Sequence, residues 1–130
     1  MITRRLLLAA IAAPVMAGPL FALVSGGIPY TPAAFAEAQK AGKSILVIVH
    51  APWCPTCKVQ DPIIQKLLGE AKYKPVTVFI VDFDTQKDAL RAFNAPKQST
   101  LIGFKGTKET NRSSGNTSPL DIEDLIESTL

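Results

Sequence analysis

The feature that most constrains this chain is a strand-like apolar run that leads directly into two closely spaced cysteines. The run is Ser44–Val49, and after a short gap comes Trp53-Cys54-Pro55-Thr56-Cys57-Lys58. An amphipathic stretch then continues to about Leu68. A helix that begins at the first cysteine would place Cys54 beside unpaired backbone N–H groups, at the positive end of the helix dipole. We therefore expect Cys54 to be more acidic than a free cysteine.

The two cysteines form one isolated pair. Cys57 lies one helical turn beyond Cys54, close enough to close a small disulfide ring. The chain has no further cysteine, so the pair does not belong to a framework that links distant segments. A zinc site needs four ligands, and the single histidine, His50, lies too near in the preceding strand to complete a set. The pair is predicted to be redox-active, with no metal bound within one chain.

Residues 1–25 have the layout of an export signal. Arg4 and Arg5 precede an apolar run, Leu6–Val24, that contains two prolines. The arginine pair resembles a twin-arginine export signal, while an ordinary Sec signal and an uncleaved membrane anchor are the alternatives. In each case the folded domain, residues 26–130, is expected outside the cytoplasm, in a bacterial periplasm.

Composition and charge indicate one ordinary globular domain. Without an export segment, about 105 residues remain, enough for a single modest core. The formal net charge of +3 falls to +1 when Arg4 and Arg5 are left out. No basic patch interleaved with aromatic residues appears, so we expect no nucleic-acid partner.

The remaining chain alternates helical and strand patterns. The predicted order is helix, strand, helix, strand, helix, strand, strand, helix. The strands are expected at 44–50, Val76–Phe83, Thr100–Lys105 and Lys108–Arg112, the last at a sheet edge. The helices are expected to follow Thr31, to run from Cys54 to about Gly69 with a bend at Pro62, to follow Asp84 or Thr85, and to follow Ser118.

These connections predict the architecture. A helical crossover makes the first two strands parallel, and the tight Gly106-Thr107 region makes the last two a hairpin. The result is an α/β fold with a mixed central sheet and helices on both faces. The buried side chains are expected to include, in the helix after the cysteines, Val59, Ile63, Ile64, Leu67 and Leu68, and in the last helix Leu120, Ile122, Leu125 and Ile126.

From about Thr31 to Leu130 the chain resembles the thioredoxin-fold thiol–disulfide oxidoreductases. The residues that carry the resemblance are Ala51-Pro52-Trp53-Cys54-Pro55-Thr56-Cys57-Lys58, Pro62, Ser99–Lys105 and Gly115. The resemblance implies a three-layer fold, protein thiols and disulfides as substrates, and no cofactor. It also implies that Cys54 is the attacking thiolate and the more exposed cysteine, and that Cys57 is the buried resolving thiol.

The chain departs from the family pattern at three positions. Ser99 stands where the family has a cis-proline, and a cis bond before a non-proline residue costs roughly 3–4 kcal/mol, so we expect a trans peptide there. Ile48 and Ile80 replace an aspartate and a lysine that handle protons in thioredoxins. The resemblance therefore implies the fold and the cysteine roles, but neither thioredoxin's proton handling nor its set of partners.

Several residues around the cysteines are candidates for tuning or substrate contact. Trp53 either shapes the contact surface or packs in the core, and Pro55 and Thr56 form an uncharged dipeptide that favours a less oxidising pair. Ser99 is expected to face the substrate, with its backbone or hydroxyl against Cys54. Four further residues have two interpretations, as site groups or as ordinary structural residues: Lys58, His50, Asp82 and Asp84.

The predicted function is exchange of disulfides with cell-envelope proteins. We expect a monomeric reductase that a membrane electron-transfer protein recharges. The alternatives are a partner in cytochrome c maturation or metal delivery, metal binding through cysteine pairs of two chains, and a binding module without catalysis.

Overall fold

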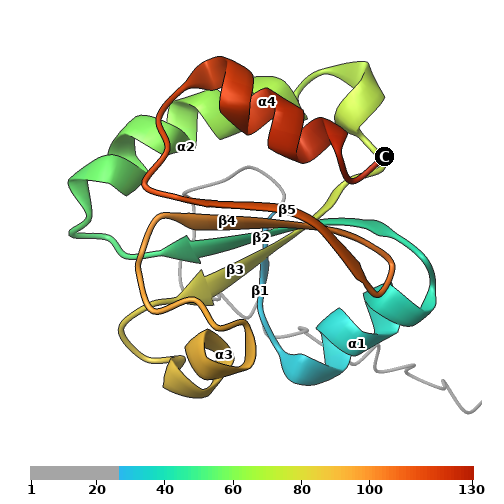
Figure 1. Ribbon diagram of the computed structural model, residues 1–130, viewed down its shortest axis with the longest axis horizontal. Coiled ribbons are helices and arrows are strands. Elements are labelled where there is room, and N and C mark those ends of the chain that lie inside the picture. The colour runs from blue at the N-terminus through green and yellow to red at the C-terminus, as the bar shows by residue number, and fades with distance from the viewer. Residues whose placement is uncertain (1–26) are drawn as a thin grey trace, which may run out of the picture.

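The computed structural model describes residues 27–130, which form one five-stranded sheet with helices on both faces (Figure 1). The predicted export segment lies outside these residues. The strand order is β1-β3-β2-β4-β5, and the strands are β1 (Ile28–Pro29), β2 (Ser44–His50), β3 (Thr77–Asp82), β4 (Thr100–Lys105) and β5 (Lys108–Ser114). The helices are α1 (Pro32–Lys40), α2 (Pro55–Leu68), the short 3₁₀ turn η1 (Ala71–Tyr73), α3 (Lys87–Ala92) and α4 (Pro119–Glu127).

The predicted α/β architecture with a mixed sheet is confirmed. β2 pairs with β3 in parallel and with β4 in antiparallel orientation, and β4 and β5 form the expected hairpin. Gly106 in that hairpin has φ +58°, a left-handed conformation that glycine adopts without steric cost. The two elements that the sequence did not predict, β1 and η1, are the shortest in the fold.

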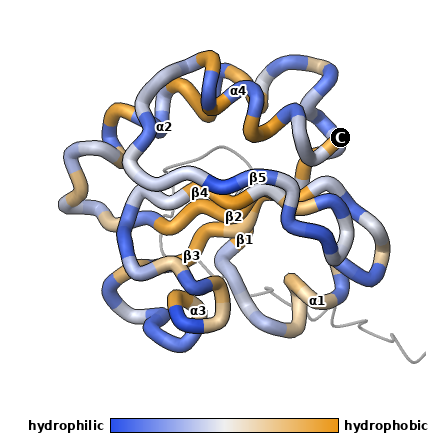
Figure 2. Tube along the Cα trace, viewed as in Figure 1, coloured by the Kyte–Doolittle hydropathy of each residue, from blue (hydrophilic) through white to orange (hydrophobic). Residues whose placement is uncertain are grey.

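Alternation along β2 divides the core into two layers. Ile45, Val47 and Val49 point toward α1 and α3, whereas Leu46 and Ile48 point toward α2 and α4. Figure 2 shows the hydrophobic centre of the sheet between helices that are hydrophobic on one side. Because β2 is covered on both faces, its residues form the continuous apolar run seen in the sequence.

Three local predictions were wrong. Val59 and Leu120 are 51% and 72% exposed, because each lies on the solvent side of its helix. The polar side chain of Gln60 is buried in α2 next to Val59. Helix α3 begins after Gln86, whose side chain makes no cap hydrogen bond, and not after Asp84 or Thr85.

Candidate functional site

Both cysteines lie where β2 ends and α2 begins. Cys54 is the N-cap of α2, and its Sγ accepts the backbone N–H of Cys57 at 3.1 Å. Pro55 occupies the first turn, where its fixed φ suits a helix start and its missing N–H removes no helical hydrogen bond. The predicted start of this helix at Cys54 is therefore confirmed.

The expectation that Cys54 is the more exposed cysteine is wrong. Cys54 is 0% exposed and Cys57 is 1% exposed, and both are free thiols. The sulfur of Cys54 points inward, because it caps the helix, and the two thiols pack with Ala51 and half-buried Phe83. Cys54 must therefore turn outward before it reacts with another protein.

Burial controls the protonation state of Cys57. Its covered position, followed by its hydrogen bond with Cys54, raises the pKa of the Cys57 thiol to about 12. Backbone hydrogen bonds with Ala51 and Ser99 act in the opposite direction but do not offset the burial. Cys57 is consequently protonated at neutral pH and has to lose a proton before it can act as a nucleophile.

Trp53 lies on the surface beside the cysteines and not in the core. Its side chain is 52% exposed, and its indole N–H donates to both carboxylate oxygens of Asp84 at 3.0 and 3.1 Å. Its ring contacts Phe83 edge-on, with a centroid distance of 5.9 Å. Asp84, expected to be a cap or strand-end residue, thus holds the tryptophan in place.

The other residues of the motif have simple positions. Pro55 and Lys58 are exposed, and Thr56 is half-buried. Lys58 therefore lies on the solvent side of α2, which agrees with its interpretation as a solvated helix residue.

Ser99 is buried, and its polar groups bond to other residues of the chain. It is 4% exposed, adopts a trans peptide as expected, and has φ +57°. Its N–H donates to Val49, its carbonyl accepts from Gly115 and Gln60, and its hydroxyl donates to Gln98. These groups are bonded within the chain, and the pairing of its backbone with a substrate strand stays a prediction. Its backbone also approaches the Cys57 thiol.

Two polar residues on the buried side of α2 were not predicted from the sequence. Gln60 is 1% exposed and donates to the carbonyls of Ser99 and Asn116, which ties α2 to both loops. Asp61 pairs with His50, with 3.2 Å between Oδ2 and the ring Nε2. The available signal was a Gln-Asp pair inside an amphipathic helix, where one of the two must face the core.

Asp61 is an unusual carboxylate. Burial raises its pKa, while the hydrogen bond and the charge of His50 act in the opposite direction. Its second oxygen, Oδ1, is covered and has no hydrogen-bond partner.

Within residues 27–130, no group of three or more His, Cys, Asp or Glu side chains is arranged to hold a metal ion. None of the helices described there has the length and apolar character to cross a membrane.

Two cysteines at the N-terminus of the helix after a central strand define a thiol–disulfide oxidoreductase, and comparison with known proteins identifies the family. The Thioredoxin family model matches residues 28–128, so the chain belongs to the thioredoxin family. A thioredoxin of Chlamydia muridarum is 36% identical over 81 residues, which cover 62% of this chain and 76% of that protein. A thioredoxin of Mycobacterium tuberculosis is 33% identical over 68% of this chain and 76% of its own length.

A solved structure is also similar to the chain. It is the Trxlp protein of Edwardsiella tarda EIB202, with 43% sequence identity and a TM-score of 0.74. The match covers 77% of this chain and 97% of that one. The domain seen here therefore corresponds to nearly the whole of that protein.

Proposed function

We propose that this protein is an exported reductase of protein disulfides in a bacterial cell envelope. Cys54 attacks a substrate disulfide, and Cys57 resolves the mixed disulfide that forms. The observation that carries these roles is the geometry of α2: the Cys54 sulfur is at the helix N-terminus, where the dipole favours negative charge, and Cys57 lies one turn further in.

Three features support the finer parts of the proposal. The uncharged Pro55-Thr56 dipeptide favours a reducing pair, and the basic and apolar start of the chain is typical of an export signal. The exposed Trp53 offers an aromatic surface beside the cysteines for a partner protein. A membrane electron-transfer protein would return two electrons to the Cys54–Cys57 disulfide, and the reductase would act as a monomer.

The roles of the cysteines are tested with two matched variants, Cys54→Ser and Cys57→Ser, in an insulin-reduction assay. Both should lose turnover, because each step needs its own thiol. Only Cys57→Ser should accumulate a mixed disulfide with insulin, which a non-reducing gel detects. A Cys54→Ser variant that still reduces insulin would overturn the proposal.

The direction of electron flow is tested by equilibrating the pair with glutathione. A reductase should have a reduction potential below about −200 mV, whereas strong oxidases of this chemistry lie near about −120 mV. A value close to the oxidases would contradict the reducing assignment. Fusion of residues 1–25 to a reporter that is active only outside the cytoplasm tests export separately.

A further inference from the structure

The buried His50–Asp61 pair joins the end of β2 to the helix that begins at the cysteines. His50 follows Leu46 and Ile48 at every second position of β2, so its side chain faces α2. Asp61 lies four residues after Cys57 on α2, and residues at this spacing are neighbours on one helix face, about 5–6 Å apart at Cβ. Figure 1 shows α2 directly above the end of β2 that leads into it.

The His50–Asp61 pair lacks one of the hydrogen bonds that a purely structural ion pair would have. The side chains of His50 and Asp61 are only 7% and 14% exposed. With Asp61 ionised, the ring N–H of His50 donates to Oδ2 at 3.2 Å, which leaves Oδ1 alone. Among the side-chain atoms of residues 27–130, Oδ1 is the one covered oxygen or nitrogen without a partner. Buried polar groups are nearly always bonded, so this oxygen calls for an explanation.

Asp61 shares its helix face with a thiol. Cys57 is buried one helical turn away and is protonated at neutral pH. His50 immediately precedes Ala51, whose backbone bonds to the Cys57 thiol. The pair thus lies within one helical turn of a thiol that must lose a proton before it can attack.

The other charged groups around this layer are engaged elsewhere or exposed. The Asp82 carboxylate on β3, in register with His50, accepts the N–H of Asp84. Beside β2 on its other side, β4 contributes the uncharged Leu101. The remaining charges lie on the two helices of this face. Lys58 and Lys66 on α2 and Asp124 on α4 are exposed, Asp121 bonds to Asn116, and Glu123 and Glu127 bond to Tyr73.

We propose that Asp61, oriented by His50, is the group that accepts the proton of Cys57 during resolution of the mixed disulfide. The inference rests on the proposed function, since it requires that Cys57 is the resolving thiol. His50 is a positioning residue: it holds Oδ2 and leaves Oδ1 free to take the proton.

The step balances in atoms and electrons. The Cys57 proton passes to Asp61 Oδ1 as the Cys57 sulfur attacks the Cys54 sulfur. The Cys54–Cys57 disulfide forms, and the bond between Cys54 and the substrate sulfur breaks. The substrate sulfur leaves with the bonding electrons and is protonated by solvent. Two electrons have then passed from the cysteines to the substrate disulfide, and Asp61 returns its proton when Cys57 is reduced again.

The test separates the two thiol steps by stopped-flow reaction of the reduced protein with Ellman's disulfide, 5,5′-dithiobis(2-nitrobenzoate). The first release of thionitrobenzoate reports attack by Cys54 and depends on reagent concentration. The second reports attack by Cys57 and is independent of it. In Asp61→Asn, near neutral pH, the second phase should slow about 100-fold, the lower end of general-base effects, while the first stays unchanged.

The pH profile distinguishes proton transfer from a structural effect. In the wild type, the second phase should level off at a pH below the ionisation of Cys57. In Asp61→Asn the rate of the second phase should rise with hydroxide concentration, so that the difference in rate from the wild type disappears at alkaline pH. His50→Gln, which keeps a donor for Asp61, should lose less rate. The matched control is Asp124→Asn, an exposed aspartate on α4, which should behave as wild type in both phases.

Each outcome decides one of the two proposals. A second phase of Asp61→Asn that matches Asp124→Asn, or that is slowed equally at every pH, overturns the role of Asp61. If Asp61→Asn does not fold, the wild-type profile decides alone, because a rate that rises continuously to the ionisation of Cys57 excludes a separate acceptor. Loss of the Cys54 role appears differently, as a first phase that persists in Cys54→Ser.

Discussion

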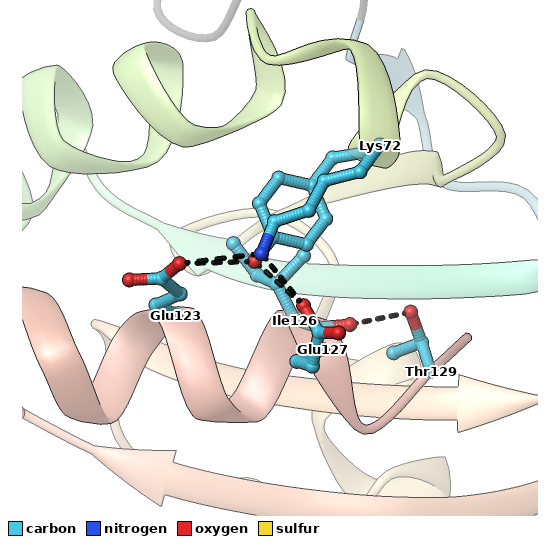
Figure 3. A network of polar contacts seen from close by, with 6 residues as sticks. Lys72, Glu123, Ile126, Glu127 and Thr129 are labelled. Atoms are coloured by element: carbon cyan, nitrogen blue, oxygen red, sulfur yellow. Dashed lines mark hydrogen bonds and ion pairs between the residues drawn. The ribbon is translucent and has the colours of Figure 1, made fainter.

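Two polar networks beside α2 are built from similar groups, yet they differ in burial and in completeness. At the cysteine end, His50 and Asp61 form a covered pair with one oxygen unbonded. At the opposite end, Lys72 and Tyr73 of η1 meet Glu123 and Glu127 of α4 (Figure 3). There the carboxylates are partly open to solvent, and each has partners.

The difference shows which network stabilises the fold and which is available for chemistry. The hydrogen bond from Tyr73 and the charge of Lys72 lower the pKa of Glu127, so its ionised form is favoured in the folded protein. Burial raises the pKa of Asp61, so its ionised form is disfavoured. A paired carboxylate with a lowered pKa, such as Glu127, joins two elements. A buried carboxylate with a raised pKa, such as Asp61, takes up a proton readily.

The largest effect is expected at the η1–α4 network. Tyr73 is 1% exposed, so Tyr73→Ala should lower the free energy of unfolding by about 3–5 kcal/mol through the cavity it leaves. Tyr73→Phe keeps the ring and should cost only about 1 kcal/mol. Urea denaturation measures both. Insulin reduction per folded molecule should not change. A loss of activity in the folded Tyr73→Phe variant would show that the η1–α4 network also affects the cysteine site.

A smaller but still large loss of stability is expected when proline replaces Ser99, at the cysteine end of the molecule. Ser99→Pro removes the N–H that donates to Val49 at 2.8 Å and forces a φ near −65° where the chain has +57°. We expect a loss of about 3 kcal/mol in urea denaturation. Ser99→Gly, which fits a positive φ, is the control and should be as stable as wild type or more so. A stable proline variant would show that this loop readily adopts the family's usual geometry.

The smallest expected effect is a gain in stability, in the variant Asp61→Asn. Because burial raises the pKa of Asp61, the folded protein holds its proton more tightly than the unfolded chain, and stability falls as pH rises through that interval. Asp61→Asn removes this penalty and should raise the midpoint of urea unfolding at neutral pH. The gain should disappear below about pH 3.8, where the unfolded aspartate is also protonated. A variant that is less stable at every pH would make the pair an ordinary structural bridge.

Much of the fold could be predicted because its signals are local. The bounds of β4 and the caps of α1 and α4 agree with the sequence analysis. Thr31 and Ser118 bond to backbone N–H groups three residues ahead, so the residues that define each cap are neighbours in sequence. The wrong placements of Val59 and Leu120 have the same origin, because periodicity identifies a helix but leaves the limits of its buried face open by one position.

The amino-acid sequence by itself determined the order of the longer helices and strands and the position of both cysteines at the start of α2, since hydrophobic periodicity, proline and helix caps act over a few residues. Only the tertiary structure decided how the site is completed. The packing of the two thiols against Phe83, the contact of Asp61 with His50 and the bonds of Ser99 to Val49 and Gly115 join different elements. Such contacts depend on which side chains packing brings together, and that is settled by the whole core at once.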